Sequence, residues 1–254
     1  MFALDFPPIS HLVEWPAFLL KDTPLAVNKV VVLIWISALL IFAFFYAASR
    51  QQQLVPKGVQ NLAEAMVEFI RGDVVMQTMG AEGLYWTPYL LTLFAFVFMC
   101  NIWEIIPVAQ MPISARIAVP LFLALVTWVS FIFIGIKRKG LGGYFKDMMF
   151  PPGVPKALYL LIAPIELVST IIVRPFSLML RLFANLLAGH LLLITFALLT
   201  ATLVQPANFV VGSIPTFVLL VALMGFELLV AVLQAYIFTI LTGAYLQTSM
   251  SHEH

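Results

Sequence analysis

The sequence predicts an all-α integral membrane protein with about five membrane-embedded helices and one interfacial amphipathic helix. The first observation is composition: hydrophobic residues make up 63% of the chain, charged residues make up 10%, and the mean hydropathy is +1.05. A soluble domain has roughly 45–50% apolar and about 25% charged residues. The second observation is that several apolar stretches reach the length of about 20 residues that a helix needs to cross a bilayer.

Composition also excludes several classes of protein. The net charge of +1 provides no basic surface for nucleic acid. The single cysteine, Cys100, supplies neither a disulfide framework nor a thiolate metal site. The N-terminus lacks the basic region of a signal peptide and the Arg/Ser-rich character of a transit peptide. We therefore expect an uncleaved chain, 1–254, that forms one membrane domain without cofactor or metal.

The first predicted elements are an extracytoplasmic segment, 1–26, and a span, 27–49, that ends before Arg50 and a glutamine run. Residues 58–79 follow a different pattern, because apolar side chains at helical spacing alternate with charged ones. That pattern is typical of an amphipathic helix lying in the membrane interface.

Two further spans are predicted at 86–106 and 117–136. The first contains Asn101 and Glu104 near its end and stops before a proline, which cannot continue a helix. The second ends before the basic run 137–139 and a glycine.

The last two apolar stretches, 157–204 and 214–250, are unusually long. As a helix the first would measure about 70 Å, against a hydrocarbon thickness of about 30 Å. Each stretch is therefore either a helical hairpin or one long tilted helix. Pro164 and Pro175 could kink the first stretch, but a kink is not a reversal. Because no polar turn interrupts either stretch, we favour long, strongly tilted helices.

Basic residues set the expected orientation. Arg50 and Lys57 follow the first span, and a second basic cluster, 137–146, follows the third. The positive-inside rule places both loops in the cytoplasm, although Lys21 and Lys29 argue the other way. Five passages then leave the N-terminus outside and the C-terminus in the cytoplasm.

Charged residues within the long stretches are the strongest functional signal. Between residues 157 and 252 only four residues carry a formal charge: Glu166, Arg174, Arg181 and Glu227. A charge at the centre of a membrane helix costs about 2.5–3.5 kcal/mol on insertion scales. Such residues are interpreted first as parts of an ion path or proton relay.

Helical geometry places these residues on defined faces. Asn185 lies about 40° from Arg181, whereas His190 lies about 180° from it. Glu227 and Gln234, seven residues apart, share a face of the last helix. His190 and Glu227 are natural partners across two packed antiparallel helices, and an acid–imidazole pair can pass protons. Arginine keeps its proton, so Arg181 can block a proton or displace one from a carboxylate.

Each residue also has a structural interpretation. His190 could only hydrogen-bond a neighbour, and Glu227 could be an ion-pair partner of one of the two arginines. Asn185 and Gln234 could be polar contacts between helices. The remaining two charges, Glu166 and Arg174, could pair with each other or extend to the interface.

Four segments carry a family resemblance. Residues 174–190, RPFSLMLRLFANLLAGH, and residues 233–239, LQAYIFT, closely resemble signatures of subunit a of F-type (F1Fo) ATP synthases, in the membrane Fo sector. Residues 101–107, NIWEIIP, resemble its asparagine–acidic–proline segment. Residues 140–143 fall where the family has a cytoplasmic glycine-rich loop. The resemblance extends from about residue 27 to the end.

The resemblance implies a stator subunit that forms two proton half-channels against a rotating ring of c subunits and performs no bond chemistry itself. Arg181 matches the arginine that faces the ring and separates the half-channels. Four residues match the outer half-channel: Asn185, His190, Glu227 and Gln234. Glu166 and Ser169 fall where the family has polar residues of the cytoplasmic half-channel. The implied partners are the c-ring, the b subunits of the peripheral stalk, the rest of the F1Fo complex and membrane lipid.

Two departures from the family pattern concern these residues. Many bacterial members have the acid and the imidazole in the opposite order to His190 and Glu227, whereas mitochondrial and some bacterial members share the order found here. The acid–imidazole pair is retained in both orders, so the same role is expected. The segment from Glu166 to Arg181 is also about one residue longer than in some members.

Other functions fit the sequence less well. A secondary transporter would show internal repeats with broken helices in both halves, and an intramembrane hydrolase would need a nucleophile–base pair or a metal cluster. His252 and His254 are too few for a zinc site, and no phosphate-binding GxxxxGK[ST] motif is present. The lack of a targeting segment favours the bacterial plasma (inner) membrane over the mitochondrial inner membrane.

Overall fold

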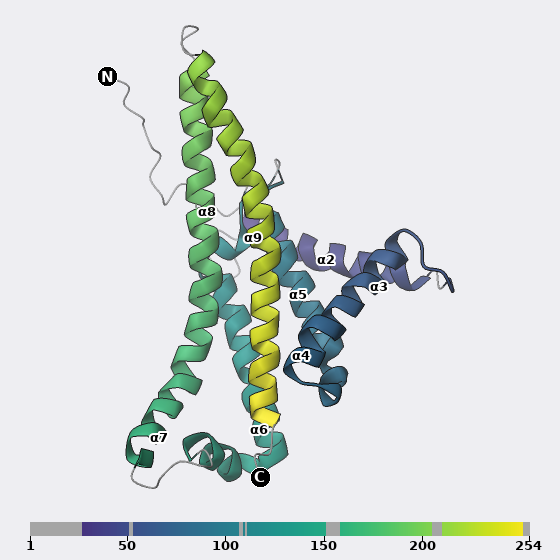
Figure 1. Ribbon diagram of the computed structural model, residues 1–254, viewed down its shortest axis with the longest axis vertical. Helices are drawn as coiled ribbons and strands as arrows, with labels where there is room; N and C mark the ends of the chain where they lie inside the picture. The colour runs from purple at the N-terminus through teal and green to yellow at the C-terminus, as the bar shows by residue number, and fades with distance from the viewer. Residues whose placement is uncertain are drawn as a thin grey trace. The chain divides into compact units, whose positions relative to one another are not determined.

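The computed structural model describes residues 27–50, 53–106, 109, 111–150, 158–204 and 210–250. The predicted N-terminal segment, 1–26, and the tail histidines, His252 and His254, lie outside the described residues. Helices dominate the described part of the chain (Figure 1).

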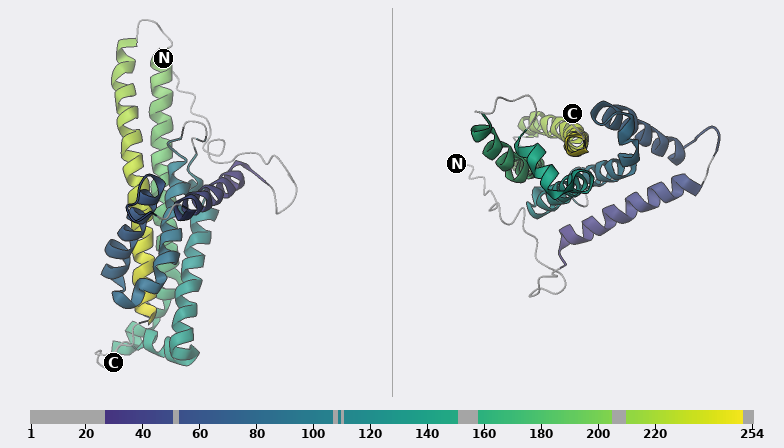
Figure 2. Two further views of the ribbon diagram at one scale, coloured as in Figure 1. Left: turned by 90° about the vertical axis from the view of Figure 1, so that its right-hand side faces the viewer. Right: turned by 90° about the horizontal axis from the view of Figure 1, so that it is seen from below.

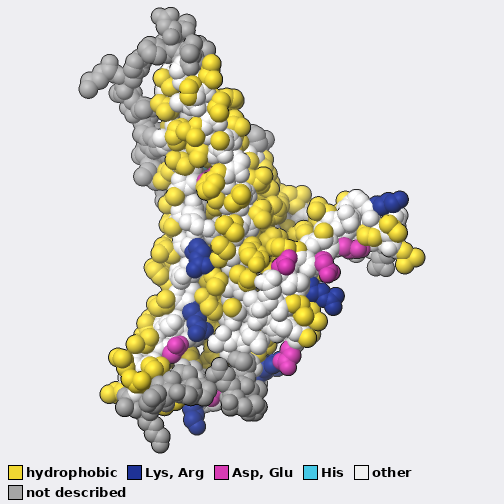
Figure 3. Space-filling view, in the orientation of Figure 1, with side chains coloured by type: hydrophobic (Ala, Val, Ile, Leu, Met, Phe, Trp, Pro, Cys, Tyr) yellow, Lys and Arg dark blue, Asp and Glu magenta, His cyan; other side chains and the backbone are white. Residues whose placement is uncertain are grey.

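Within these described residues, five helices are long and apolar enough to cross a membrane: Lys29–Arg50, Ala81–Ile102, Ala118–Met149, Tyr159–Val204 and Gly212–Met250. Hydrophobic side chains are widely exposed on the face drawn in Figure 3. Large exposed side chains include Trp35, Leu39 and Phe42. Exposed apolar surface of this extent suits lipid better than water. The all-α membrane fold class is therefore confirmed.

The first span is α2 (Lys29–Arg50), close to the predicted bounds. The amphipathic stretch is helical but not uniform: α3 (Val59–Phe69) continues into a π-helical turn, η1 (Ile70–Val75), and then α4 (Met76–Thr78). The buried side chains of η1 are apolar, as an amphipathic helix requires. Its location at a membrane surface remains a prediction.

The second span begins with a 3-10 helix, η2 (Ala81–Trp86), and continues as α5 (Thr87–Ile102). A short 3-10 helix, η3 (Ile113–Ala115), follows before the third span.

The third span, α6 (Ala118–Met149), extends beyond the predicted end at residue 136. Its backbone is non-helical at Gly140, where φ is 74°, a conformation that residues with a Cβ rarely adopt. Gly140 turns the chain, and the ring of Tyr144 lies against Gly135 of the preceding part of α6. The expected glycine-rich loop at 140–143 is therefore corrected: the turn is made at one glycine, and helical structure resumes after it.

The last two apolar stretches are long helices, not hairpins. The first comprises α7 (Tyr159–Val168), a π-helical turn, η5 (Ser169–Val173), and α8 (Arg174–Val204), together a 46-residue helical segment. The second is α9 (Val210–Met250), with 41 residues. Their tilt relative to a bilayer remains a prediction.

The chain forms two compact units. The first consists of Met1–Tyr46, Ala95–Arg116 and Phe183–Ala235. Within it, the second part of α8 and the first part of α9 run side by side in opposite directions (Figures 1 and 2). Buried side chains of this unit include Val97, Leu186 and Ala231.

The second unit consists of Ala47–Phe94, Ile117–Leu182 and Tyr236–His254. It contains α3, η1, α4, η2, α6, α7 and η5, together with the end of α2, the beginnings of α5 and α8, and the end of α9. Its core includes Leu90, Phe131 and Leu246, each almost completely buried.

Candidate functional site

An acid and an imidazole meet in the interior of the first unit. His190 Nδ1 on α8 lies 3.5 Å from Glu104 Oε1, and the two side chains are only 7% and 2% exposed. Glu104 follows α5 in a turn in which its own backbone N–H donates to the carbonyl of Asn101. The turn allows a residue just beyond a helix end to direct its side chain into the unit.

The neighbours of Glu104 anchor this turn on both sides. Asn101 is fully buried; its amide donates to the Ala231 carbonyl of α9 at 3.5 Å and accepts from Ser114 Oγ at 2.8 Å. Trp103 Nε1 donates to Ser37 Oγ of α2 at 2.7 Å. These bonds connect the turn to α2, η3 and α9, so the position of Glu104 is determined by three separate contacts.

Glu227 of α9 approaches α8 at a glycine. A Cβ on Gly189 would overlap the Glu227 carboxylate, so only glycine leaves space for this side chain. Glu227 is also within electrostatic range of both Glu104 and His190. The sequence predicts that His190 and Glu227 are partners. The structure adds Glu104 as a third ionisable side chain beside them.

Among the described residues, Glu227 Oε2 is a buried oxygen without a hydrogen-bond donor, whereas Glu104 Oε1 has the His190 imidazole as its neighbour. Two buried carboxylates repel each other when both are ionised, and each lacks the solvation that water would provide. Protons shared among the two acids and the imidazole relieve both costs. We refer to Glu104, His190 and Glu227 as the acid–imidazole cluster.

The other predicted residues of the outer half-channel differ in burial. Glu227 and Gln234 are each 4% exposed, and Ala231 between them is 1% exposed, which confirms that they share one face of α9. Asn185 is exposed on α8. The structure therefore places Gln234 on the buried face of the cluster and leaves Asn185 at the surface.

Arg181 of α8 is half-buried between the fully buried Leu178 and Leu182. Among the residues that the structure describes, its guanidinium has no ion-pair partner. The cost of such a charge in an apolar environment is offset when a negative group reaches it. In the described chain no carboxylate supplies that charge.

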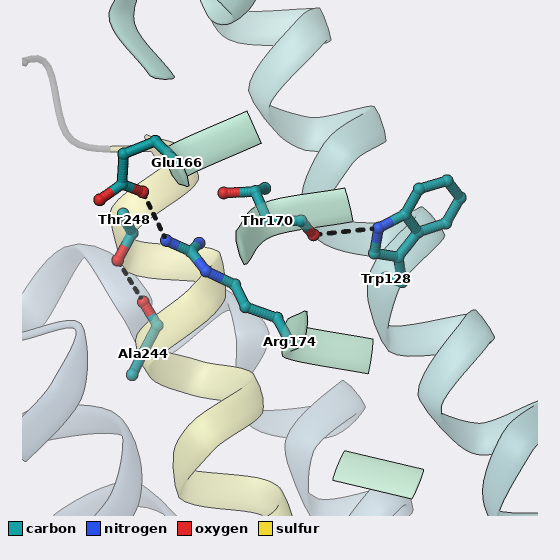
Figure 4. Close-up of polar contacts among 6 residues, drawn as sticks. All are labelled: Trp128, Glu166, Thr170, Arg174, Ala244 and Thr248. Carbon is teal, nitrogen blue, oxygen red and sulfur yellow. Dashed lines mark hydrogen bonds and ion pairs between the residues drawn. The ribbon is translucent and has the colours of Figure 1, made fainter. Parts of the chain in front are cut away.

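The second unit holds a separate ion pair. Glu166 Oε2 of α7 lies 3.9 Å from Arg174 Nη2 of α8, so of the two alternatives that the sequence left open, the structure shows the mutual pair. The Arg174 guanidinium carbon also lies 5.4 Å from the ring centroid of Tyr245. Figure 4 shows the guanidinium directed toward the Glu166 carboxylate. Ser169 begins the π-helical turn between the two charges.

A family model, described as the ATP synthase A chain, matches residues 31–247. The chain belongs to this family. A relative from Frankia alni, named ATP synthase subunit a, is 47% identical over 91% of this chain and 80% of its own length. Relatives of the same name from Parafrankia sp. and Rhodococcus erythropolis are 41% and 37% identical, over 96% and 94% of this chain and 83% and 88% of their own lengths.

Within this ATP synthase A chain family member, sequence reasoning did not assign a site role to Glu104, Asn101 or Gly189. Glu104 and Asn101 belong to a segment that resembles the family, and an acid in an apolar run is itself a signal. No spacing rule, however, links Glu104 to His190, because the turn after α5 and helix α8 are distant in the sequence.

Proposed function

We propose that the chain is the stator subunit of a rotary ATP synthase, forming two proton half-channels against a ring of c subunits and coupling proton translocation to ring rotation. The observation that carries this proposal is the buried acid–imidazole cluster, whose members lie 3.5 Å apart at the Glu104–His190 contact. Family membership supports the same conclusion.

In the proposed outer half-channel, protons pass from outside through His190, Glu104 and Glu227 to a carboxylate on a c subunit. Gln234 and Asn185 provide polar contacts along this path. Imidazole suits this role because it changes protonation near neutral pH. The ring then carries the neutral carboxyl through lipid, where a bare charge would be costly.

Arg181 is the proposed separator of the two half-channels. A guanidinium keeps its proton, so it cannot conduct protons, but it favours the ionised form of an arriving carboxyl. Its lack of an ion-pair partner among the described residues is consistent with a partner on another chain. A fixed positive charge also opposes proton leak down a gradient worth about 2.3 kcal/mol per 100 mV.

On the cytoplasmic side, the released proton leaves through the region of Glu166 and Ser169. The subunit itself performs no bond chemistry and needs no cofactor, and ATP is handled elsewhere in the F1Fo complex. The proposed contacts are the c-ring, the b subunits of the peripheral stalk and membrane lipid. The proposed location is a bacterial plasma membrane, with the N-terminus outside and the C-terminus in the cytoplasm.

The test is ATP-driven proton pumping by vesicles carrying the complex with Arg181→Ala, with passive proton leak recorded in the same preparation. We expect pumping to be lost and leak to rise. Arg138→Ala, in the basic run of α6 just before Gly140, is the matched control and should pump normally. Unchanged pumping by assembled Arg181→Ala complexes would contradict the separator role.

A further inference from the structure

Glu166 and Arg174 pair although their separation does not suit a regular α-helix. They are eight residues apart, which corresponds to a rotation of about 80° around an α-helix, whereas a separation of seven leaves about 20°. Their charged atoms nevertheless lie 3.9 Å apart. The helix between them must therefore depart from α-helical geometry.

The departure is the π-helical turn Ser169–Val173. A π turn closes its hydrogen bonds from residue i to i+5 and so contains one residue more than an α turn. That extra residue returns Glu166 to the angular position that it would have at a separation of seven. The π turn thus sets the register of the ion pair.

Contacts to α6 hold the π turn. Trp128 Nε1 donates to the carbonyl of Thr170 at 3.3 Å, and Figure 4 shows the indole directed at that oxygen. A turn that interrupts the α-helical ladder changes which carbonyls are satisfied internally, and an external donor compensates. Thr170 is 2% exposed, whereas Ile172 on the same turn is 58% exposed.

Arg174 is held more firmly than its partner. Its guanidinium lies over the ring of Tyr245, a favourable arrangement of cation and aromatic face. That ring packs against Phe131 with centroids 5.8 Å apart. The Arg174 side chain is 22% exposed, against 40% for Glu166, so Glu166 is the more accessible end of the pair.

We propose that Arg174 is a positioning residue: seated on Tyr245, and in register through the π turn, it orients the Glu166 carboxylate for proton exit. Because the guanidinium keeps its proton, Arg174 directs the carboxylate without relaying protons itself. The assignment of proton exit to Glu166 rests on the proposed function, whereas the register of the pair rests on the π turn.

The first experiment measures passive proton flux through vesicles that contain the membrane sector, normalised to assembled complex. Arg174→Gln should lower the flux on the order of tenfold, since small errors in position cost large factors in rate. Arg174→Lys should restore part of it, because it keeps the charge but not the planar guanidinium. Tyr245→Leu removes the ring that lies under the guanidinium and should resemble Arg174→Gln.

Normal flux in assembled Arg174→Gln complexes would overturn the positioning role. Failure of Arg174→Lys to exceed Arg174→Gln would also overturn it. Glu166→Gln serves as the reference for the proposed function: if it conducts normally while Arg174→Gln does not, the exit role of Glu166 fails and the effect of Arg174 has another origin.

The second experiment tests the register without any assumption about proton transfer. Spin labels at Glu166→Cys and Arg174→Cys, in a Cys100→Ala background, report their separation through dipolar broadening. Deletion of Ile172 should leave the broadening unchanged, because seven residues in an α-helix replace eight residues that include a π turn. Insertion of one alanine after Ile172 should reduce it. A change on deletion equal to that on insertion would overturn the register argument.

Discussion

The imidazole of His190 and the carboxylate of Glu104 lie 3.5 Å apart, with both side chains almost completely withdrawn from solvent. They come from different helical segments, α8 and the turn after α5. Glu227 approaches from a third, α9, against Gly189. A buried group of this kind is stable only when its protons and charges are shared, so changes to any member have measurable consequences.

Glu104→Gln should lower passive proton flux at least about tenfold, because a positioned acid or base typically contributes such factors or more. The amide keeps the size of the side chain but cannot accept and release a proton. Glu82→Gln, which changes an exposed acid on η2, is the control and should conduct normally. Equal flux in both variants would exclude Glu104 from the path.

Gly189→Ala should lower the apparent melting temperature of the solubilised complex and reduce proton flux. The added methyl group overlaps the Glu227 carboxylate, and overpacking of this kind typically costs about 1–3 kcal/mol. The shorter acid in Glu227→Asp should restore part of both losses in the double variant. Gly225→Ala, at a glycine of α9 with open space around it, should change neither quantity; a loss of the same size there would show that any added methyl group disturbs these helices.

Asn101→Leu should destabilise the first unit by about 1–3 kcal/mol, because Ser114 Oγ and the Ala231 carbonyl each lose a buried partner. Differential scanning measurements on the solubilised complex report this as a lower melting temperature. Asn61→Leu alters an exposed amide of α3 and is the comparison. We expect Asn101→Leu also to weaken proton flux, since the turn that carries Glu104 loses its anchor; intact stability would argue that the turn is held by Trp103 alone.

Trp128→Phe should cost about 0.5–1.5 kcal/mol, the typical net value of one intramolecular hydrogen bond. The ring remains, but the N–H that donates to the Thr170 carbonyl is removed. Protection of amides near Thr170 against hydrogen exchange should fall, while protection in η1 should not. Uniform loss of protection along both segments would indicate general destabilisation instead of a local effect on the π turn.

Composition and the lengths of apolar runs determined most of the fold. A chain with so few charges must place its apolar stretches in lipid, and helices are the structures that these runs support. The first span was predicted at 27–49 and observed at Lys29–Arg50, and the last helix was predicted at 214–250 and observed at Val210–Met250. These elements depend on local hydrophobicity, which a sequence displays directly.

The sequence also determined which residues bear the chemistry, since each intramembrane charge is costly enough to require a role. The sequence could not determine which of these side chains contact one another. Helical periodicity gives the direction of a side chain around its own helix, but the partner of His190 depends on how α5 ends and on the contacts of Asn101 and Trp103. Only tertiary packing brought Glu104 to the imidazole.

The pairing of Glu166 with Arg174 was decided in the same way. A separation of eight residues predicts different faces if every turn is α-helical, and the longer spacing from Glu166 to Arg181 was visible in the sequence without a structural explanation. The tertiary structure accommodates the additional residue as a π turn, held by Trp128 from another helix. Local propensity cannot specify such a turn, because its stability comes from a hydrogen bond and packing between segments that are distant along the chain.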